Sequence, residues 1–300
     1  MKNRMNRLGT STEDKVLYTV VTVFMVLLLI IIIYPLIYVV SSSFSSGSAV
    51  TSGKVLLWPV EPTLTGYRLV FSYRRVWTGY KNTIIYTVAG TVLNIFLTTC
   101  AAYPLSRSNF QARKLFTTFF MITMFFSGGI IPSYILMTNL HFTNTRWAVL
   151  FTGAVSIYNM IIMRTFFQNS IPKELHEAAV IDGVDDIGYL VRVVMPLSKA
   201  IYAVITLYYA VAHWNSYFTA MMYLRNREYW PLQMILRDIL NASRVDLSQI
   251  EDAELLAQLI GAADVMKFSL IIISAAPVMI AYPFVARFFE KGVMIGSVKG

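Results

Sequence analysis

Six stretches of this chain are apolar and contain no aspartate, glutamate, lysine or arginine. A helix that crosses a bilayer of about 30 Å takes roughly 20 residues, and five of the stretches reach or approach that length. The fourth stretch is shorter and needs flanking residues to reach the length of a membrane span. The pattern predicts an all-α integral membrane protein with six transmembrane helices. The stretches are Val16–Val40, Thr83–Leu105, Leu115–Leu136, Trp147–Met163, Ile201–Tyr223 and Phe268–Ala286.

The composition agrees with a protein that uses lipid as part of its solvent. Hydrophobic residues make up 56% of the chain and charged residues only 14%, about half the share of a soluble domain. The net charge of +9 would suggest nucleic acid in a soluble protein, but the basic residues are spread around the apolar runs. Membrane topology explains them better, and no nucleic acid partner is expected. The one cysteine, Cys100, lies in an apolar run and excludes an intrachain disulfide; we expect it to be a small buried side chain.

The distribution of basic residues predicts the orientation in the membrane. The first apolar run follows Lys2, Arg4, Arg7 and Lys15 and is too long for a cleaved signal peptide, whose core has roughly 7–15 residues. It is therefore expected to remain as a helix with a cytoplasmic N terminus. With six spans both termini lie inside, and the basic connection 106–114 falls on the cytoplasmic side, as such loops do.

A polar island interrupts the apolar runs between Ile171 and Pro196, with the sequence IPKELHEAAVIDGVDDIGYLVRVVMP. Ser170 can cap a first helix, and Gly183 can end it in the left-handed conformation. Asp185 or Asp186 can cap a second helix, whose buried stripe is predicted at Ile187, Leu190, Val191 and Val194. Glu177, Ala178 and Ala179 lie on the first helix. A helix on lipid headgroups favours basic and large apolar residues, so alanines and acids suit a protein groove better.

The same island resembles the EAA loop of bacterial ABC importer permeases. That loop has the pattern E-A-A, three residues, G, nine residues, I-x-L-P. Here Glu177, Ala178, Ala179, Gly183 and Pro196 match its fixed positions, and only Val193 and Met195 differ from the pattern, by conservative changes in volume.

The resemblance implies a type I ABC importer permease fold and a coupling hairpin over residues 170–196. In this family the hairpin sits in a cleft of a separate cytoplasmic ATPase and transmits its closure to the membrane helices. The implied partners are a second homologous permease that forms a heterodimer, two copies of the ATP-binding subunit, and an extracytoplasmic solute-binding protein. No cofactor is implied. Residues 1–300 are expected to form a single permease domain in the bacterial cytoplasmic membrane.

The resemblance extends from about Tyr34 to the C terminus and points to carbohydrate uptake. The segment 127–134, SGGIIPSY, is similar to a subgroup that imports oligosaccharides and complex glycans. The C-terminal tail is similar to that of the smaller maltose-system permease, which reaches between the two ATPase subunits. The matching positions here are Gly296, Lys299 and Gly300. A frayed, solvated terminus is the alternative interpretation of this tail.

A sugar path combines aromatic faces with hydrogen-bonding groups, because sugars present both C–H faces and hydroxyls. The fifth apolar run supplies such residues at Tyr209, His213, Trp214 and Asn215. Helix packing is the alternative for each of them. The connection 224–267 is predicted outside the cell; it carries acidic residues at Asp246, Glu251, Asp252 and Glu254, and in the family the corresponding loop contacts the binding protein. A solvated surface helix is the alternative there.

Two other classes of membrane protein compete with this interpretation. An ion-coupled secondary transporter usually needs an intramembrane carboxylate or ion site, and no apolar run contains one. A membrane enzyme needs a catalytic constellation, but His141, His176 and His213 are far apart in sequence, and neither metal spacing nor a nucleotide-binding loop is present. No catalytic residue is predicted, and ATP hydrolysis is expected in a separate subunit.

Overall fold

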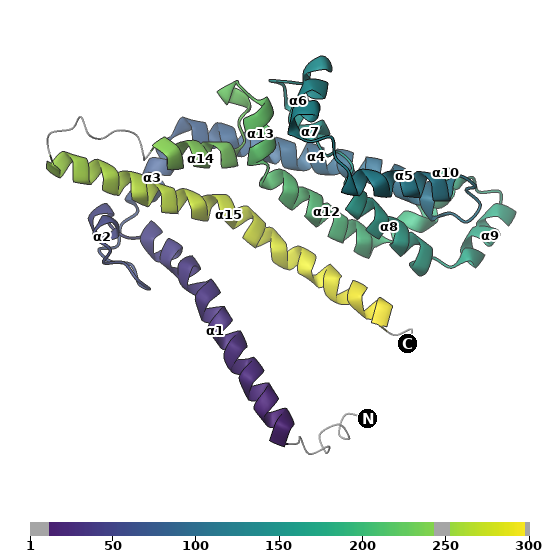
Figure 1. Cartoon of the computed structure of the whole chain (residues 1–300), viewed down its shortest axis with the longest axis horizontal. Coiled ribbons are helices and arrows are strands. Elements are labelled where there is room, and N and C mark those ends of the chain that lie inside the picture. The colour runs from purple at the N-terminus through teal and green to yellow at the C-terminus, as the bar shows by residue number, and fades with distance from the viewer. Residues whose placement is uncertain (1–11, 243–252, 298–300) are drawn as a thin grey trace. The chain divides into compact units, whose positions relative to one another are not determined.

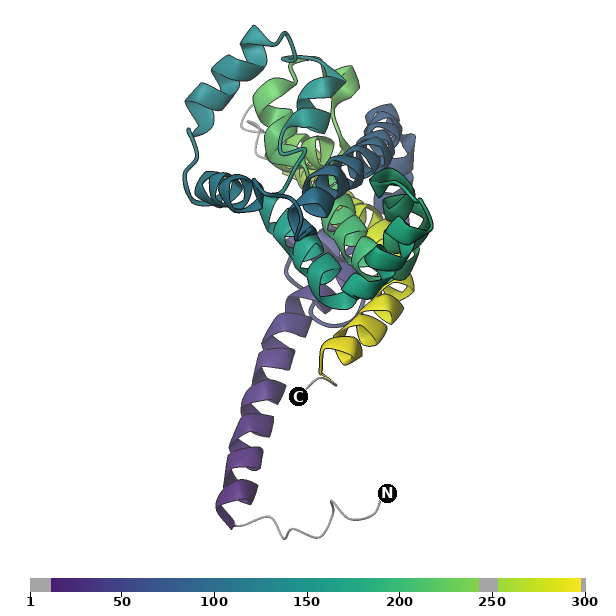
Figure 2. The same ribbon diagram turned by 90° about the vertical axis from the view of Figure 1, so that its right-hand side faces the viewer.

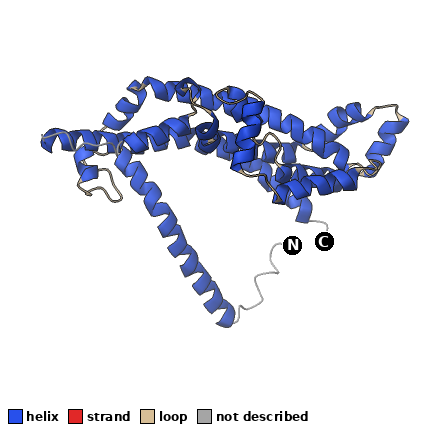
Figure 3. Cartoon of the chain, turned by 45° about the horizontal axis from the view of Figure 1, so that its top comes forward, coloured by secondary structure: helices blue, strands red, loops and turns tan. Residues whose placement is uncertain are grey.

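The computed structural model describes residues 12–242 and 253–297, and within these ranges every regular element is a helix (Figure 3). The longest helices are α1 (Thr12–Ser43), α4 (Arg74–Ser106) and α15 (Ala253–Ser297). The shorter elements are α2 (Gly47–Thr51), α3 (Thr65–Ser72), α5 (Arg113–Phe125), α6 (Ile130–Asn139), α7 (Arg146–Phe151), α8 (Ile157–Ser170), α9 (Lys173–Ile181), α10 (Asp186–Tyr189), a π-helix η2 (Leu190–Val194), α11 (Met195–Leu197), α12 (Lys199–Trp214), α13 (Tyr217–Tyr223), a 3₁₀-helix η3 (Arg227–Tyr229) and α14 (Leu232–Ala242).

The chain divides into two compact units. The first comprises residues 1–72 and 240–273. Its organising feature is the serine-rich end of α1, where Ser41, Ser43 and Ser45 are buried. The hydroxyl of Ser41 donates to the carbonyl of Leu57 at 2.6 Å, and the hydroxyl of Ser45 accepts from the N–H of Val60 at 3.0 Å. These bonds fix the loop that follows α2, because buried polar groups require partners.

The second unit comprises residues 73–239 and 274–300. In it α4 packs against both α8 and α12, and the three helices lie side by side in two perpendicular views (Figures 1 and 2). Their contact is filled by buried side chains that include Ala102, Met160, Met163 and Ile205. The same cluster continues to Ala179, Tyr189 and Val194. The hairpin over residues 170–196 is therefore built onto the core of this unit.

Membrane-spanning length and apolarity are found in three single helices. They are α1, α4 and the part of α15 from 260 to 283, and up to five spans result if two bent helix pairs each count as one. The predicted first, second and sixth spans thus correspond to single helices. The predicted third span is divided into α5 and α6, which meet at 114°. The count of six remains a prediction.

The backbone conformation of two glycines explains why the predicted third and fourth spans are each divided into two helices. Gly129 separates α5 from α6 with φ +87°, and Gly153 lies between α7 and α8 with φ +71°. Positive φ is accessible to glycine without a steric penalty and cannot continue a right-handed helix. The predicted fifth span is divided at Asn215 and Ser216, between α12 and α13.

Candidate coupling hairpin and polar cavity

The hairpin begins with a break in the helix that precedes it. Ser170 is the last residue of α8, Ile171 is extended with φ −110° and ψ 111°, and α9 starts at Lys173 with Pro172 before it. The predicted cap at Ser170 is wrong, because the N-cap is Pro172 and no side chain caps this helix. The physical reason is steric: the residue before a proline avoids the helical region, which moves the start of the helix downstream.

The first arm ends in a two-bond turn at Gly183. The N–H of Gly183 donates to the carbonyl of Val180 at 3.1 Å, and the N–H of Val184 donates to the carbonyl of Ala179 at 2.9 Å. This pair of bonds is the Schellman motif, which requires a left-handed residue. Gly183 has φ +72°, so its predicted left-handed conformation is confirmed.

The second arm is capped by Asp185, one of the two residues predicted. Its carboxylate accepts from the N–H of Gly188 at 3.1 Å. The predicted buried stripe is only partly right: Val194 is buried, but Ile187 and Val191 are 72% and 55% exposed. Tyr189 is buried instead. Val191 lies inside the π-helix η2, where the α-helical spacing used for the prediction does not hold, whereas Ile187 precedes η2 and lies in the first turn of α10.

The Glu-Ala-Ala segment does not present both alanines to the same environment. Ala179 is buried against Tyr189 and Val194, whereas Glu177 and Ala178 are exposed. The end of α9 also carries Ile181, which is 84% exposed. Together Ile181 and Ile187 give the turn between the two arms an exposed apolar surface, which a partner protein could cover.

Pro196 lies where the hairpin joins α12. In η2 the N–H of Met195 bonds to the carbonyl of Leu190, five residues back, and the next residue, Pro196, has no N–H to continue a ladder. The segment 186–197 and α12 meet at 84°. The sharp bend therefore has two local causes, a π-turn and a proline.

A polar cavity of about 290 Å³ lies among α4, α7, α8, α12 and α13 of the second unit. The Tyr209 hydroxyl shares a hydrogen bond of 2.6 Å with Thr98 and accepts one from the N–H of Ser156 at 3.0 Å. Asn94 Nδ2 lies 3.2 Å from Nε2 of His213, which can accept this bond in its neutral form. The cavity is lined by Asn94, Val149, Thr152, Gly153, Ser156, Asn159, Tyr208, Tyr209, Ala212, His213, Ser216 and Thr219.

Two of the four residues predicted for a sugar path line this cavity, and two do not. Tyr209 and His213 line it, while Trp214 is buried elsewhere and donates from Nε1 to the carbonyl of Ser274 at 2.9 Å. Asn215 is exposed, and its Nδ2 bonds to the carbonyl of Val211 in its own helix. Trp214 thus joins α12 to α15, and Asn215 bonds back to α12; a contact of either residue with sugar stays a prediction.

Sequence reasoning missed Asn94 and Asn159, which line the cavity from α4 and α8. Both are buried, and Oδ1 of Asn94 has no hydrogen-bond partner among the described residues. A signal was present, because a buried amide in a membrane helix is costly and therefore usually functional or bridging. Asn94 and Thr98, four residues apart, also share a helix face.

Some predicted residues lie outside the region that the structure describes. Gly296 belongs to α15, but Lys299 and Gly300 follow the last described residue. The acidic residues Asp246, Glu251 and Asp252 fall in the undescribed segment 243–252. Cys100 is described, and the prediction that it is buried is wrong: it is exposed on α4.

Comparison with known proteins finds full-length relatives, although no family model matches the chain. The chain is 35% identical to the polygalacturonan/rhamnogalacturonan transport system permease protein YtcP of Bacillus subtilis, over 92% of this chain and 96% of that protein. It is 36% identical to Protein LplC of the same organism, over 89% of each. Among solved structures, a bacterial ABC transporter involved in the import of the acidic polysaccharide alginate matches with a TM-score of 0.83 and 35% identity. The match covers 93% of this chain and 98% of that one.

Proposed function

Because the chain belongs to the permease subunits of bacterial sugar ABC importers, we propose that its hairpin over residues 170–196 is the element on which a separate ATPase acts. As such a permease it is a multi-pass membrane protein that moves a sugar, and ATP hydrolysis resides in another subunit. No observation favours the ion-coupled transporter considered from the sequence.

The coupling role is supported by one arrangement: hydrogen bonds hold the turn between the two arms, and the exposed tip at this turn is apolar. The Schellman turn at Gly183 and the cap at Asp185 hold the two arms, while Ile181 and Ile187 project outward. Covering one such side chain contributes about 1.5–3 kcal/mol. Glu177 and Ala178 lie on the exposed side of the same arm. A cleft that closes on this tip moves the whole hairpin.

Pro196 and the π-turn transmit that movement to the membrane. They join the hairpin directly to α12, and α12 packs on α4 across the polar cavity. A displacement of the hairpin therefore changes the environment of Tyr209 and His213. In alternating access, this is the place where a path opens and closes. We include the cavity in the sugar path, with Tyr209 and His213 as contacts.

The proposed assembly is the one that the resemblance to the family implies. It comprises this chain, a second homologous permease as a heterodimer, two ATP-binding subunits and an extracytoplasmic binding protein. This chain contributes six spans as one permease domain, with both termini in the cytoplasm. The density of basic residues between α4 and α5 supports this orientation. The connection 224–267 faces the binding protein, and the tail at Gly296, Lys299 and Gly300 reaches the ATPase.

The substrate is a sugar oligomer, and an acidic one is favoured by a basic cavity at the start of α4. Arg74, Arg75 and Arg227 line this cavity of about 670 Å³ together with Tyr73, Thr78 and Glu228. Arginine suits carboxylates because its planar fork donates two parallel hydrogen bonds. One relative is named for polygalacturonan and rhamnogalacturonan transport, and the matching solved structure is of a transporter that imports the acidic polysaccharide alginate. Competition of uptake by galacturonate oligomers, but not by neutral oligomers of equal length, tests this substrate class.

The first experiment tests the assembly and the hairpin together. The tagged chain is extracted in mild detergent, and copurifying proteins are identified by mass spectrometry. In a Cys100→Ala background, Ala178→Cys should crosslink to a copurifying ATPase, because Ala178 is exposed on the first arm. Recovery of a second permease and an ATPase supports the proposal. Recovery of the chain alone, even after crosslinking, contradicts it.

A further inference from the structure

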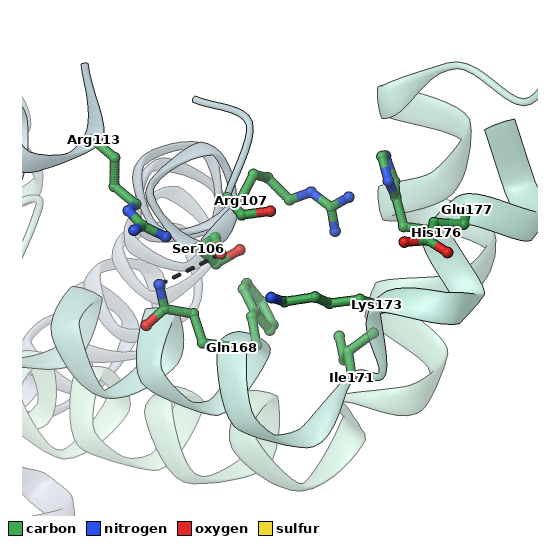
Figure 4. Close-up of a pocket in the computed structure, with 10 residues that line it drawn as sticks. Ser106, Arg107, Arg113, Gln168, Ile171, Lys173, His176 and Glu177 are labelled. Carbon is green, nitrogen blue, oxygen red and sulfur yellow. Dashed lines mark hydrogen bonds between the residues drawn. The ribbon is translucent and has the colours of Figure 1, made fainter. Parts of the chain in front are cut away.

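A second cavity, of about 330 Å³, lies between the end of α4 and the base of the hairpin (Figure 4). Its size is at the lower end of the range for small-molecule sites, roughly 300–1,000 Å³. All of its walls belong to the second unit. It is lined by Ser106, Arg107, Ser108, Arg113, Phe167, Gln168, Ile171, Lys173, His176 and Glu177.

Three basic side chains face this cavity from three segments. Arg107 follows α4, Arg113 begins α5 and Lys173 begins α9, and their side chains point into the same space (Figure 4). Among the described residues, none of the three forms an ion pair with a carboxylate. Glu177 is the one carboxylate that lines the cavity. The site therefore carries an excess of positive charge that the described part of the chain does not neutralise.

Arg107 is held in place without using all of its donors. Its guanidinium lies over the rings of Tyr103 and Tyr189, with the carbon 5.8 Å and 5.2 Å from the ring centres. Its Nε is buried and has no hydrogen-bond partner among the described residues. A buried charged donor without a partner costs free energy, and a charged acceptor would remove that cost. Two ring contacts thus hold Arg107 at the edge of the cavity, and among the described residues no carboxylate pairs with its charge, which favours an anion there.

The start of α9 adds to the positive electrostatic potential in this cavity. The helix begins at Lys173, beside the cavity, and its N-cap Pro172 provides no side-chain oxygen for the first N–H groups. An uncapped helix N terminus favours anions through its free N–H groups and its dipole. Glu174, in the first turn of α9, offsets part of this effect but does not line the cavity. Three cations and a helix terminus together match an oxyanion with several acceptor oxygens better than a single carboxylate.

We propose that this cavity binds a phosphate group. The group has two possible sources with the same chemistry, the headgroup of an anionic phospholipid and a soluble phosphate. The lipid source rests on the proposed cytoplasmic position of the hairpin, whereas the site itself does not. An occupant would join the end of α4 to the base of α9, and it would thereby restrain the hairpin that the proposed coupling mechanism moves.

Binding to the purified full-length chain tests the site without any transport assay. Phosphatidylglycerol is the lipid probe, followed by native mass spectrometry, and inorganic phosphate is the soluble probe, followed by equilibrium dialysis. The variants are Arg113→Gln and Lys173→Gln. Lys114→Gln is the matched control, because Lys114 is adjacent in sequence and exposed but does not line the cavity. Lys173→Arg keeps the charge and should keep binding.

We expect saturable binding of at least one probe. Each cavity variant should weaken it about tenfold, the effect of losing one charged hydrogen bond, and the control should leave it unchanged. Binding of phosphatidylglycerol alone identifies the lipid source, and binding of phosphate alone the soluble one. Thermal unfolding of each variant in detergent shows whether lost binding reflects lost structure.

Three results would overturn the proposal. The first is that a probe binds, but Lys114→Gln weakens binding as much as the cavity variants, which indicates general attraction by basic charge. The second is that neither probe binds saturably and the cavity variants keep recovery of an ATPase. The third is that neither probe binds and the cavity variants abolish that recovery, which assigns the cations to a protein contact. Failure of the coupling role is detected separately, by uptake of Gly183 variants.

Discussion

The N–H of Val184 donates a hydrogen bond to the carbonyl oxygen of Ala179 at 2.9 Å across the turn at Gly183. Ala179 is buried in the main core cluster of its unit, and Val184 packs against that cluster. The bond therefore connects the core to the turn that separates the two arms of the hairpin. An apolar contact accompanies the hydrogen bond, as is usual in this motif. The turn is therefore stabilised both by the backbone hydrogen bond and by the packing of Val184 on the core cluster.

Gly183→Val should uncouple transport while the protein still inserts in the membrane. Gly183 has φ +72°, and nothing lies within 4 Å of an added Cβ, so the effect comes from backbone strain alone, about 1–3 kcal/mol for a β-branched side chain. The strain should open the turn and displace the hairpin tip. Sugar uptake in proteoliposomes is expected to fall at least about tenfold, measured at equal amounts of inserted protein.

Gly183→Asn is the matched control for that variant. Asparagine adopts the left-handed conformation more readily than other non-glycine residues, so it should retain most of the uptake. Uptake by Gly183→Val equal to that of the unmodified chain would count against a coupling role for the turn.

Ile181→Asp should weaken association with the ATPase. Ile181 is 84% exposed, so the substitution should change the free energy of unfolding by no more than about 0.5 kcal/mol. A charge at a central apolar contact costs roughly 2 kcal/mol or more of binding. Recovery of the ATPase with the tagged chain should fall sharply.

The control for Ile181→Asp is Leu56→Asp, which changes another exposed apolar residue, 61% exposed, in the first unit. It should leave ATPase recovery unchanged. Equal loss in both variants would indicate a general effect of surface charge, and no loss in either would remove Ile181 from the contact.

Gly90→Ala should destabilise the chain. A Cβ at this position would lie 2.3 Å from Nε2 of His213, so the imidazole must move away from its contact with Asn94. Overpacking of this kind costs about 1–3 kcal/mol. Denaturant titration in detergent micelles measures the change. Gly128→Ala is the control, since its Cβ would meet only Pro132 at 3.6 Å, and a loss as large in the control would show that the effect is not specific to this contact.

Tyr209→Phe should also reduce stability, for a different reason. The Tyr209 hydroxyl accepts from the N–H of Ser156 and shares a hydrogen bond with Thr98. Its removal leaves a backbone donor without its partner, at a cost of about 1–3 kcal/mol. Tyr158→Phe removes a hydroxyl from an exposed tyrosine on α8 and should have little effect. The same titration compares the two variants, and equal free energies of unfolding would contradict the role given to the Tyr209 hydroxyl.

Local features of the site could be predicted from neighbouring residues. Gly183 is the residue that a left-handed turn needs, and Asp185 stands where a helix cap is needed; both act within a few residues of themselves. Pro172 shows the limit of such reasoning. Its steric effect on Ile171 competed with the capping propensity of Ser170 and determined where α9 starts.

Membrane character was equally accessible from the sequence, because 20 consecutive apolar residues have few alternatives to a spanning helix. The positions at which those apolar runs are interrupted could not be predicted from the sequence. The break between α5 and α6, which meet at 114°, falls at Gly129 with φ +87°, and a hydropathy pattern carries no information on backbone angles.

By itself, the sequence determined the lipid-compatible helices, the turn at Gly183 and the motif that identified the family, since each depends on composition or on residues close together. Only the tertiary structure decided that Asn94 meets His213, 119 residues away, and that Arg107, Arg113 and Lys173 share one cavity. The physical reason is that side chains from distant segments meet according to how the helices pack, α4 on α12 for the first pair and the end of α4 near α5 and α9 for the cations. Helix packing is a property of complementary surfaces that no single segment encodes.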